Sequence, residues 1–174
     1  IADRFEGDSL QRMVSLDVDL IDFYDKQIQQ LDLYLEQHAQ LDDPDTFFRL
    51  QSIPGVGRIL AMTMLYEIHT IKRFPTGGDF LSYSRLVKGT NCSAGKNYKP
   101  TGRKIGNPHL KWAFSEAITL LKRECPQAKA FAERIEKKHN KARANTLLAI
   151  KLGRAVYWMW RRKAAINPNV FAKE

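Results

Sequence analysis

The run from Gly89 to Lys111, GTNCSAGKNYKPTGRKIGNPHLK, places the strongest limit on how this chain can fold. It contains four glycines, two prolines and five Lys or Arg residues, and it contains no Asp or Glu. Segments with clear helical periodicity precede and follow it. Because the run has no apolar face to bury, it predicts a long surface loop within a helical domain. Loops of this length inside compact domains are uncommon and are usually functional or disordered.

Charge is divided unevenly along the 174 residues. Residues 1–50 contain 12 Asp or Glu and 4 Lys or Arg, a net charge of −8, whereas residues 51–174 contain 7 acidic and 24 basic residues, a net charge of +17. So basic a segment is typical of nucleic-acid-binding proteins, although a basic surface that is merely well solvated has the same composition. The two cysteines and four histidines show no disulfide or metal-ligand spacing, and no signal or membrane-spanning sequence is visible. We therefore expect a cytoplasmic protein with an anionic partner and no membrane contact.

A heptad-like pattern near the start of the chain predicts a helix from roughly Ser9 to Leu41. At 1.5 Å per residue such a helix is about 50 Å long, which exceeds a small domain. It therefore needs a second helix to cover its seam, either within this chain or in another copy. We expect a homodimer or higher oligomer, with a coiled-coil segment at 1–44 and a helical domain at 45–174. The seam consists of Leu10, Val14, Ile21, Tyr24, Ile28, Leu31 and Leu35.

The segment 45–70 has the pattern of a helix-hairpin-helix, with helices expected on both sides of Ile53-Pro54-Gly55-Val56-Gly57. Gly55 and Gly57 allow a tight turn, and Val56 can pack between the two helices. The amides at the start of the second helix, next to Arg58, would then be able to hold a DNA phosphate. Such a contact reads the backbone and not the base sequence. The alternative is a purely structural helical hairpin.

The remaining helices follow from apolar periodicity and from capping residues. We expect a short helix at 80–87 begun by Asp79, a loop at 88–106, and C-terminal helices within 107–165. Asn107-Pro108 is a good N-cap and first-turn pair for the helix that follows the loop. The predicted class is all-α, with at most a short strand pair around Tyr98. For Trp158 and Trp160, packing in the core or against a partner is favoured over base stacking. The expected C-terminal helices cover 108–124, 127–138 and 143–165.

Ser93 is the best nucleophile candidate, with Cys92 beside it. A serine that attacks a phosphodiester needs an accessible hydroxyl, cations that hold the phosphate and a group that takes its proton. No such base is evident in the sequence, and a serine in a glycine-rich loop is commonly a turn residue. The cations available in or just after the loop are Lys96, Lys99, Arg103, Lys104 and Lys111.

The order of these motifs resembles the C-terminal part of the insertion-sequence one-ten family of transposases, also called one-sixteen/nine-oh-two. In that family an IPGxG segment is followed by a serine-glycine loop and then by a helix that starts with a K-x-G-N-x-x-L-R-like pattern. Here the pattern is met by Lys104 to Lys111, KIGNPHLK, after the CSAGK of the loop. The resemblance covers about residues 45–160. This chain differs in having Ala94 after the serine, where glycine is common, and Lys111 in place of arginine.

The resemblance implies an enzyme whose serine, by position Ser93, attacks DNA and becomes covalently linked to it during recombination. It also implies a RuvC-like domain with four acidic residues and a divalent metal, such as Mg²⁺, preceding the coiled coil and outside this chain. A structured guide RNA, multimeric action and a bacterial or archaeal, nucleoid-associated setting are further implications. We therefore expect this chain to bind nucleic acid but not to recombine it by itself.

Two other classes of protein remain compatible with the sequence. One is a non-catalytic helix-hairpin-helix module that binds DNA or RNA; it predicts normal function after Ser93→Ala. The other is a coiled-coil interaction protein whose basic half binds protein. Its affinity would depend little on salt, whereas phosphate contacts give a steep dependence.

Overall fold

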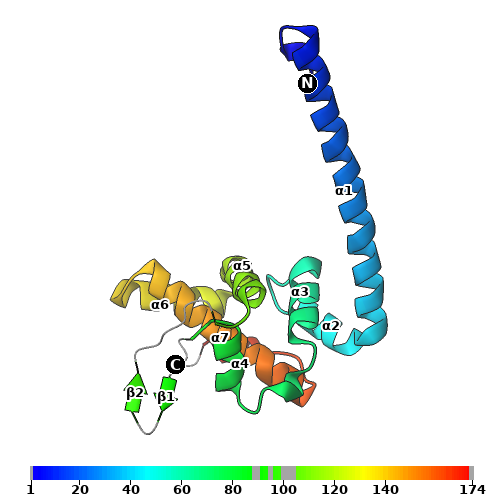
Figure 1. The fold of residues 1–174 in the computed structure, drawn as a ribbon. Helices are drawn as coiled ribbons and strands as arrows, with labels where there is room; N and C mark the ends of the chain where they lie inside the picture. The colour runs from blue at the N-terminus through cyan, green and yellow to red at the C-terminus, as the bar shows by residue number, and fades with distance from the viewer. Residues whose placement is uncertain (1, 88–90, 94–95, 99–104, 173–174) are drawn as a thin grey trace. The chain divides into compact units, whose positions relative to one another are not determined.

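A computed structural model describes residues 2–87, 91–93, 96–98 and 105–172, and the backbone forms two compact units, Ile1–Asp42 and Asp43–Glu174. The described residues form seven α-helices and one pair of three-residue strands (Figure 1). The all-α class predicted from periodicity is therefore confirmed.

Unit 1 consists of a short 3₁₀ turn, Ala2–Arg4, and the helix α1, Asp8–Asp42. The long helix expected from the heptad-like pattern is thus confirmed, with ends one residue from the predicted ones. Its large apolar side chains are exposed, with Met13 at 62% and Leu31 at 61% of their full accessibility. Whether a second helix covers this seam stays a prediction.

Unit 2 begins with α2, Pro44–Gln51, and α3, Arg58–Ile68. Asp43 caps α2 by accepting a hydrogen bond from the Thr46 amide at 3.1 Å. A 3₁₀ turn at Ile71–Arg73 then leads to α4, Gly77–Tyr83. The prediction of a helix at 80–87 begun by Asp79 was wrong in register. Thr76 is the N-cap, and Asp79 completes a capping box with it.

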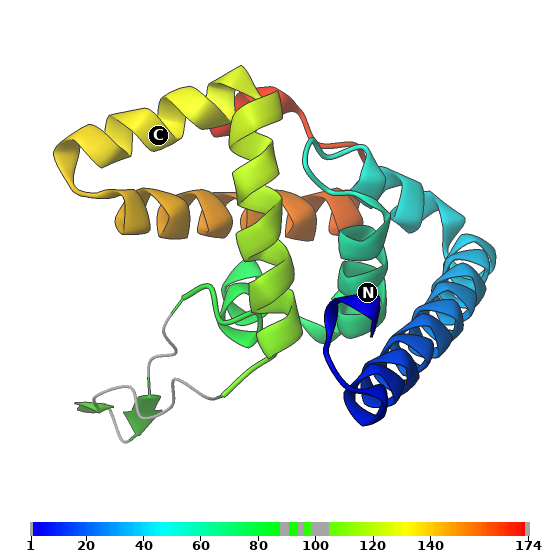
Figure 2. The same ribbon diagram turned by 90° about the horizontal axis from the view of Figure 1, so that it is seen from above.

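The C-terminal part of unit 2 contains α5, Pro108–Glu124; α6, Pro126–Lys138; and α7, Lys141–Arg162. In Figure 2, α7 turns back alongside α6 and crosses α5. Contacts join α6 to α7, α5 to α7 and α5 to α6. A short 3₁₀ turn, Pro168–Phe171, packs against α6. These helices agree with the predicted ones within about three residues at their ends.

The core of unit 2 lies between α5, α7 and the aromatic residues around α4. Phe80 contacts the rings of Phe74 and Phe114 at centroid distances of 5.3 and 6.1 Å. Tyr157 of α7 is buried, and its hydroxyl donates to the carbonyl of Phe74 at 3.2 Å. The apolar face of α5 is buried along its whole length, as the sequence pattern predicted. That face consists of Leu110, Ala113, Phe114, Ala117, Ile118 and Leu121.

Candidate nucleic-acid interface and serine loop

The turn between α2 and α3 is built from the sequence Ile53-Pro54-Gly55-Val56-Gly57. Ile53 and Val56 are buried, and the Val56 amide donates to the Ile53 carbonyl at 2.9 Å, which closes the turn. Gly55 has a φ of +86°, in the left-handed region that favours glycine. The helices and the buried valine expected from the sequence are present. That this hairpin binds DNA stays a prediction.

Gly55 packs directly against the C-terminal half of α5. A Cβ atom at this position would lie 2.6 Å from the backbone nitrogen of Leu121 and 2.8 Å from the carbonyl oxygen of Ala117. The Gly55 amide donates to Oε2 of Glu124 at 3.1 Å. This amide therefore already has an anionic acceptor from within the chain, so it is unavailable to a phosphate while that bond persists.

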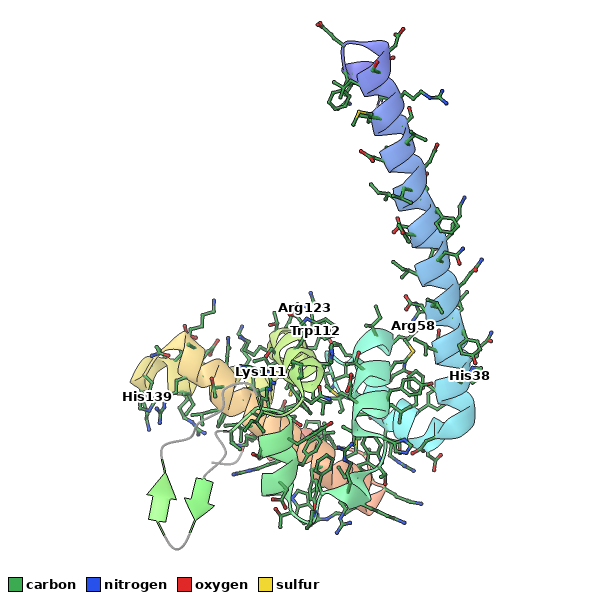
Figure 3. All side chains as sticks on the ribbon, viewed as in Figure 1. His38, Arg58, Lys111, Trp112, Arg123 and His139 are labelled. Carbon is green, nitrogen blue, oxygen red and sulfur yellow. The ribbon has the colours of Figure 1, made fainter. Side chains whose placement is uncertain are left out.

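Gly57 and Arg58, at the start of α3, lie in a different environment from Gly55. Gly57 is the exposed N-cap of α3, and a Cβ built on it meets no atom within 4 Å. Within the described part of the chain, no side chain caps this helix through a hydrogen bond. Because the first amides of a helix have no partners within it, the start of α3 is the part of the hairpin suited to an anion. Arg58 is exposed there (Figure 3).

Ser93 lies at the end of strand β1, Asn91–Ser93, which pairs antiparallel with β2, Lys96–Tyr98. The short strand pair expected around Tyr98 is thus present. In its register Ser93 lies opposite Lys96, so the backbone brings the candidate nucleophile next to one candidate phosphate-binding lysine. Nothing is described of either side chain. Lys99, Arg103 and Lys104 lie outside the described residues.

The two sides of the serine loop meet at the C-terminal end of α4. The Asn107 amide donates to the Tyr83 carbonyl at 2.6 Å, and Nε of Arg85 donates to the Ile105 carbonyl at 3.2 Å. Gly106 has a φ of +100°, and a Cβ there would lie 2.5 Å from the Tyr83 carbonyl oxygen. The loop therefore leaves and returns at one place, which we call the stem: Tyr83–Arg85 together with Ile105–Asn107.

Asn107 connects the stem to two helices. Its Oδ1 accepts from the Leu110 amide at 3.0 Å, which confirms the predicted N-cap of α5. Its Nδ2 donates to Oε2 of Glu67 on α3, and lies 3.4 Å from the Tyr83 hydroxyl. Glu67 was missed by the sequence analysis, since nothing in its local pattern links it to a residue 40 positions away. A buried polar N-cap that needs a partner for its second polar atom was the available signal.

The exposed side of α5 carries Lys111 and Trp112 near its start and Arg123 near its end. Trp112 is 47% exposed. In Figure 3, Arg58, Trp112 and Arg123 lie along the upper side of unit 2 as drawn. A surface that carries both cations and an exposed indole suits a nucleic acid, because phosphates pair with the cations and bases stack on the ring.

The two tryptophans of α7 differ from each other. Trp160 is buried, as predicted, whereas Trp158 is 48% exposed. The Arg162 guanidinium lies 4.6 Å from the centre of the Trp158 ring, so a cation of the same helix covers one face of this indole. Trp158 thus contacts a cation of its own helix, and its exposure is similar to that of Trp112.

In the described part of the chain, no three His, Cys, Asp or Glu side chains are grouped so that they could hold a metal ion. The helices described for the chain include none with the length and hydropathy to cross a bilayer.

Fold and site together define a basic helical domain in which the two ends of the serine loop are hydrogen-bonded to each other immediately before α5, a helix with exposed cations. Residues 48–133, from α2 into α6, match the family model of the Transposase IS116/IS110/IS902 family. Over these residues the chain is similar to a domain of that transposase family, and the match is consistent with the C-terminal part of such a transposase. The family implies a DNA-acting enzyme with a role in transposition. No curated protein and no solved structure matches the chain.

Proposed function

We propose that this chain is the DNA-binding, serine-bearing part of a transposase and that Ser93 attacks a phosphodiester of insertion-sequence DNA. In this step Oγ forms a bond to phosphorus while the bond from phosphorus to one deoxyribose oxygen breaks. The serine proton ends on the released deoxyribose hydroxyl, so the ester is conserved and no co-reactant is consumed. The phosphoserine linkage then stores the strand end for rejoining.

The observation that carries the proposal is the stem. A nucleophile gains rate from being held in place, since fixing the reacting groups can contribute several orders of magnitude. The hydrogen bonds from Asn107 to Tyr83 and from Arg85 to Ile105 fix both ends of the loop that contains Ser93. They fix them immediately before α5, whose exposed side carries Lys111 and Trp112. The loop's own cations, Lys96 among them, then complete the phosphate site.

Trapping of the covalent protein–DNA adduct tests the nucleophile in the full-length transposase. We expect Ser93→Ala to abolish the adduct while DNA affinity changes by less than about threefold. Cys92→Ala controls for the neighbouring thiol, and Ser115→Ala controls for the loss of an exposed hydroxyl on α5; both should retain the adduct. An adduct that survives Ser93→Ala would refute the assignment.

The other parts of the proposal concern what works with this domain. We propose that a divalent metal, bound by a four-carboxylate RuvC-like domain outside this chain, acts together with Ser93 and that a structured guide RNA selects the DNA. This chain alone then binds nucleic acid without recombining it. The working location is the cytoplasm of a bacterium or archaeon, at the nucleoid.

We further propose that α1 joins two or more copies through its exposed seam. Leu31 and Ile28 lie on that seam and are 61% and 54% exposed. Leu31→Asp should weaken self-association at least about tenfold, because it places a charge in an apolar interface. Gln30→Asp, which adds the same charge off the seam, should leave it within about twofold. Sedimentation analysis that finds a monomer at every concentration would remove this part of the proposal.

The second candidate function is a non-catalytic module that uses the hairpin to bind DNA or RNA. The uncapped start of α3, beside Arg58, favours it. Gly57→Asp should lower DNA affinity about tenfold if this helix start holds a phosphate, because the new carboxylate takes the same amides and repels the anion. Gly57→Asn, which caps without charge, is the matched control. If binding weakens in this way while Ser93→Ala leaves transposition intact, the module hypothesis replaces the catalytic one.

A further inference from the structure

We propose that Glu67 is a positioning residue for the serine loop and acts through the side-chain amide of Asn107. The inference rests on the proposed attack by Ser93, since the stem joined by these two residues carries the loop that contains this serine. It assigns a role to an acidic residue of α3 that lies well before the loop in sequence. Glu67 is not proposed to touch DNA or to take the serine proton.

The two polar atoms of the Asn107 side chain have different partners, which fixes the orientation of the side-chain amide. Its Oδ1 is occupied by the Leu110 amide at 3.0 Å, so the side chain cannot flip without losing the cap of α5. Its Nδ2 is therefore fixed toward Oε2 of Glu67, with the Tyr83 hydroxyl at 3.4 Å. Asn107 is only 8% exposed, and buried polar groups are costly to leave unpaired. The orientation of the Asn107 side-chain amide thus determines both the cap of α5 and the contact with Glu67 on α3.

Tyr83 of α4 provides a second contact for Asn107, through the backbone. Its carbonyl accepts from the Asn107 amide at 2.6 Å, and the Arg73 guanidinium lies 4.6 Å from the centre of its ring. Helices α3, α4 and α5 therefore meet at Asn107, where the loop ends. A displacement of about 1 Å at such a point can cost about 100-fold in rate when it moves a reacting group.

Asn107 donates and Glu67 accepts in this hydrogen bond, so exchanging donor and acceptor between the two positions tests the proposal. Asn107→Asp keeps the cap, because Asp and Asn are equally good N-caps, but it places two carboxylates face to face. Glu67→Gln keeps an acceptor for Nδ2 of Asn107, because the new amide can present its oxygen. The double variant restores the link in reverse, with the amide at position 67 donating to the carboxylate at position 107. Glu136→Gln, on the exposed side of α6, controls for loss of one negative charge.

Adduct formation by the full-length transposase gives the functional result. We expect Asn107→Asp to slow it at least about 30-fold with DNA affinity and its salt dependence nearly unchanged. Glu67→Gln should stay within about threefold of the unaltered protein, and the double variant should regain at least about tenfold over Asn107→Asp alone. A general base would respond differently, because Glu67→Gln would then abolish the reaction.

Amide hydrogen exchange on the 174-residue chain gives a result that does not depend on the reaction. The amide at position 107 should exchange about tenfold faster in Asn107→Asp and recover in the double variant. If the double variant is no better than Asn107→Asp in either measurement, the positioning role is overturned. If the unaltered full-length protein forms no adduct, or if the adduct survives Ser93→Ala, the proposed function fails whatever the exchange result. The two failures are therefore separate.

Discussion

The two ends of α5 are each fixed by a glycine in the left-handed region, but by different kinds of contact. At the C-terminal end Gly55, with a φ of +86°, packs flat against the backbone of Leu121. At the N-terminal end Gly106, with a φ of +100°, lets the chain turn so that the Asn107 amide reaches the Tyr83 carbonyl. The first end is held mainly by close packing, and the second by a buried set of hydrogen bonds.

This difference separates two tasks. Close packing fixes how near two elements lie but tolerates small rotations, whereas hydrogen bonds to a buried amide also fix orientation. The end of α5 that requires orientation is the one next to the serine loop. The Gly55 end is suited to joining the α2–α3 hairpin rigidly to the rest of unit 2.

The largest effect is expected for Gly55→Ala. A Cβ atom 2.6 Å from the backbone nitrogen of Leu121 forces α5 away, and the positive φ adds strain. We expect unit 2 to lose about 3 kcal/mol of unfolding free energy in denaturant titrations. Gly57→Ala, with nothing within 4 Å of its new Cβ and a φ of −78°, is the matched control and should change stability by less than about 1 kcal/mol. Equal losses from the two changes would mean that Gly55 does not pack as described.

A smaller loss, about 2 kcal/mol, is expected for Gly106→Ala, because the second and third nearest atoms to its new Cβ lie at 3.1 and 3.2 Å, whereas at Gly55 both lie at 2.8 Å. The nearest atom is the Tyr83 carbonyl oxygen at 2.5 Å, which is also the acceptor for the Asn107 amide. The loss should therefore be accompanied by faster exchange of that amide. Gly55→Ala should lower the free energy of unfolding more than Gly106→Ala does, but it should accelerate exchange of the Asn107 amide less. If both changes accelerated exchange of the Asn107 amide equally, the proposed difference between the two ends of α5 would be wrong.

The smallest effect is expected for Glu124→Ala. The change leaves the buried Gly55 amide without its acceptor. Because the Glu124 side chain is 44% exposed, we expect the free energy of unfolding to fall by only about 1 kcal/mol, measured by thermal unfolding. Glu124→Gln keeps an acceptor and should cost less than about 0.5 kcal/mol. Binding of DNA is the second measurement. If Glu124 keeps a phosphate from Gly55, Glu124→Gln should raise DNA affinity; unchanged affinity would place the phosphate at the start of α3 or exclude the hairpin.

Most of this fold follows from local sequence patterns. The apolar period of α5 and the pair Asn107-Pro108 predict that helix and its first residue, because both signals act within one or two turns. The register of α4 was predicted less well. Asp79 is a good capping residue by type, but Thr76 takes the N-cap because the two side chains can satisfy each other's backbone amides.

The contacts that organise the candidate site are not local, and this is why the sequence did not predict them. Glu67 and Asn107 are 40 residues apart, and Gly55 and Glu124 are 69 residues apart. Each pair depends on how the helices pack, and a single sequence does not encode that packing in any spacing. Ser93 was singled out as a candidate from the loop itself and was given its role by resemblance, and that role stays a prediction. For Lys96 the structure adds only that its backbone lies opposite that of Ser93 in the strand pair.

The stem also has a consequence for how this protein can change over evolution. Tyr83 and Asn107 are hydrogen-bonded to each other, so the 23 residues between them begin and end at the same point. The entropy of closing such a segment grows only with the logarithm of its length, and doubling it costs about 0.6 kcal/mol. Insertions and deletions within 88–104, between the two sides of the stem, should therefore change the stability of the helices little. The length of the loop can therefore diverge among relatives outside Ser93 and the cations near it, while the stem and the helices stay constant.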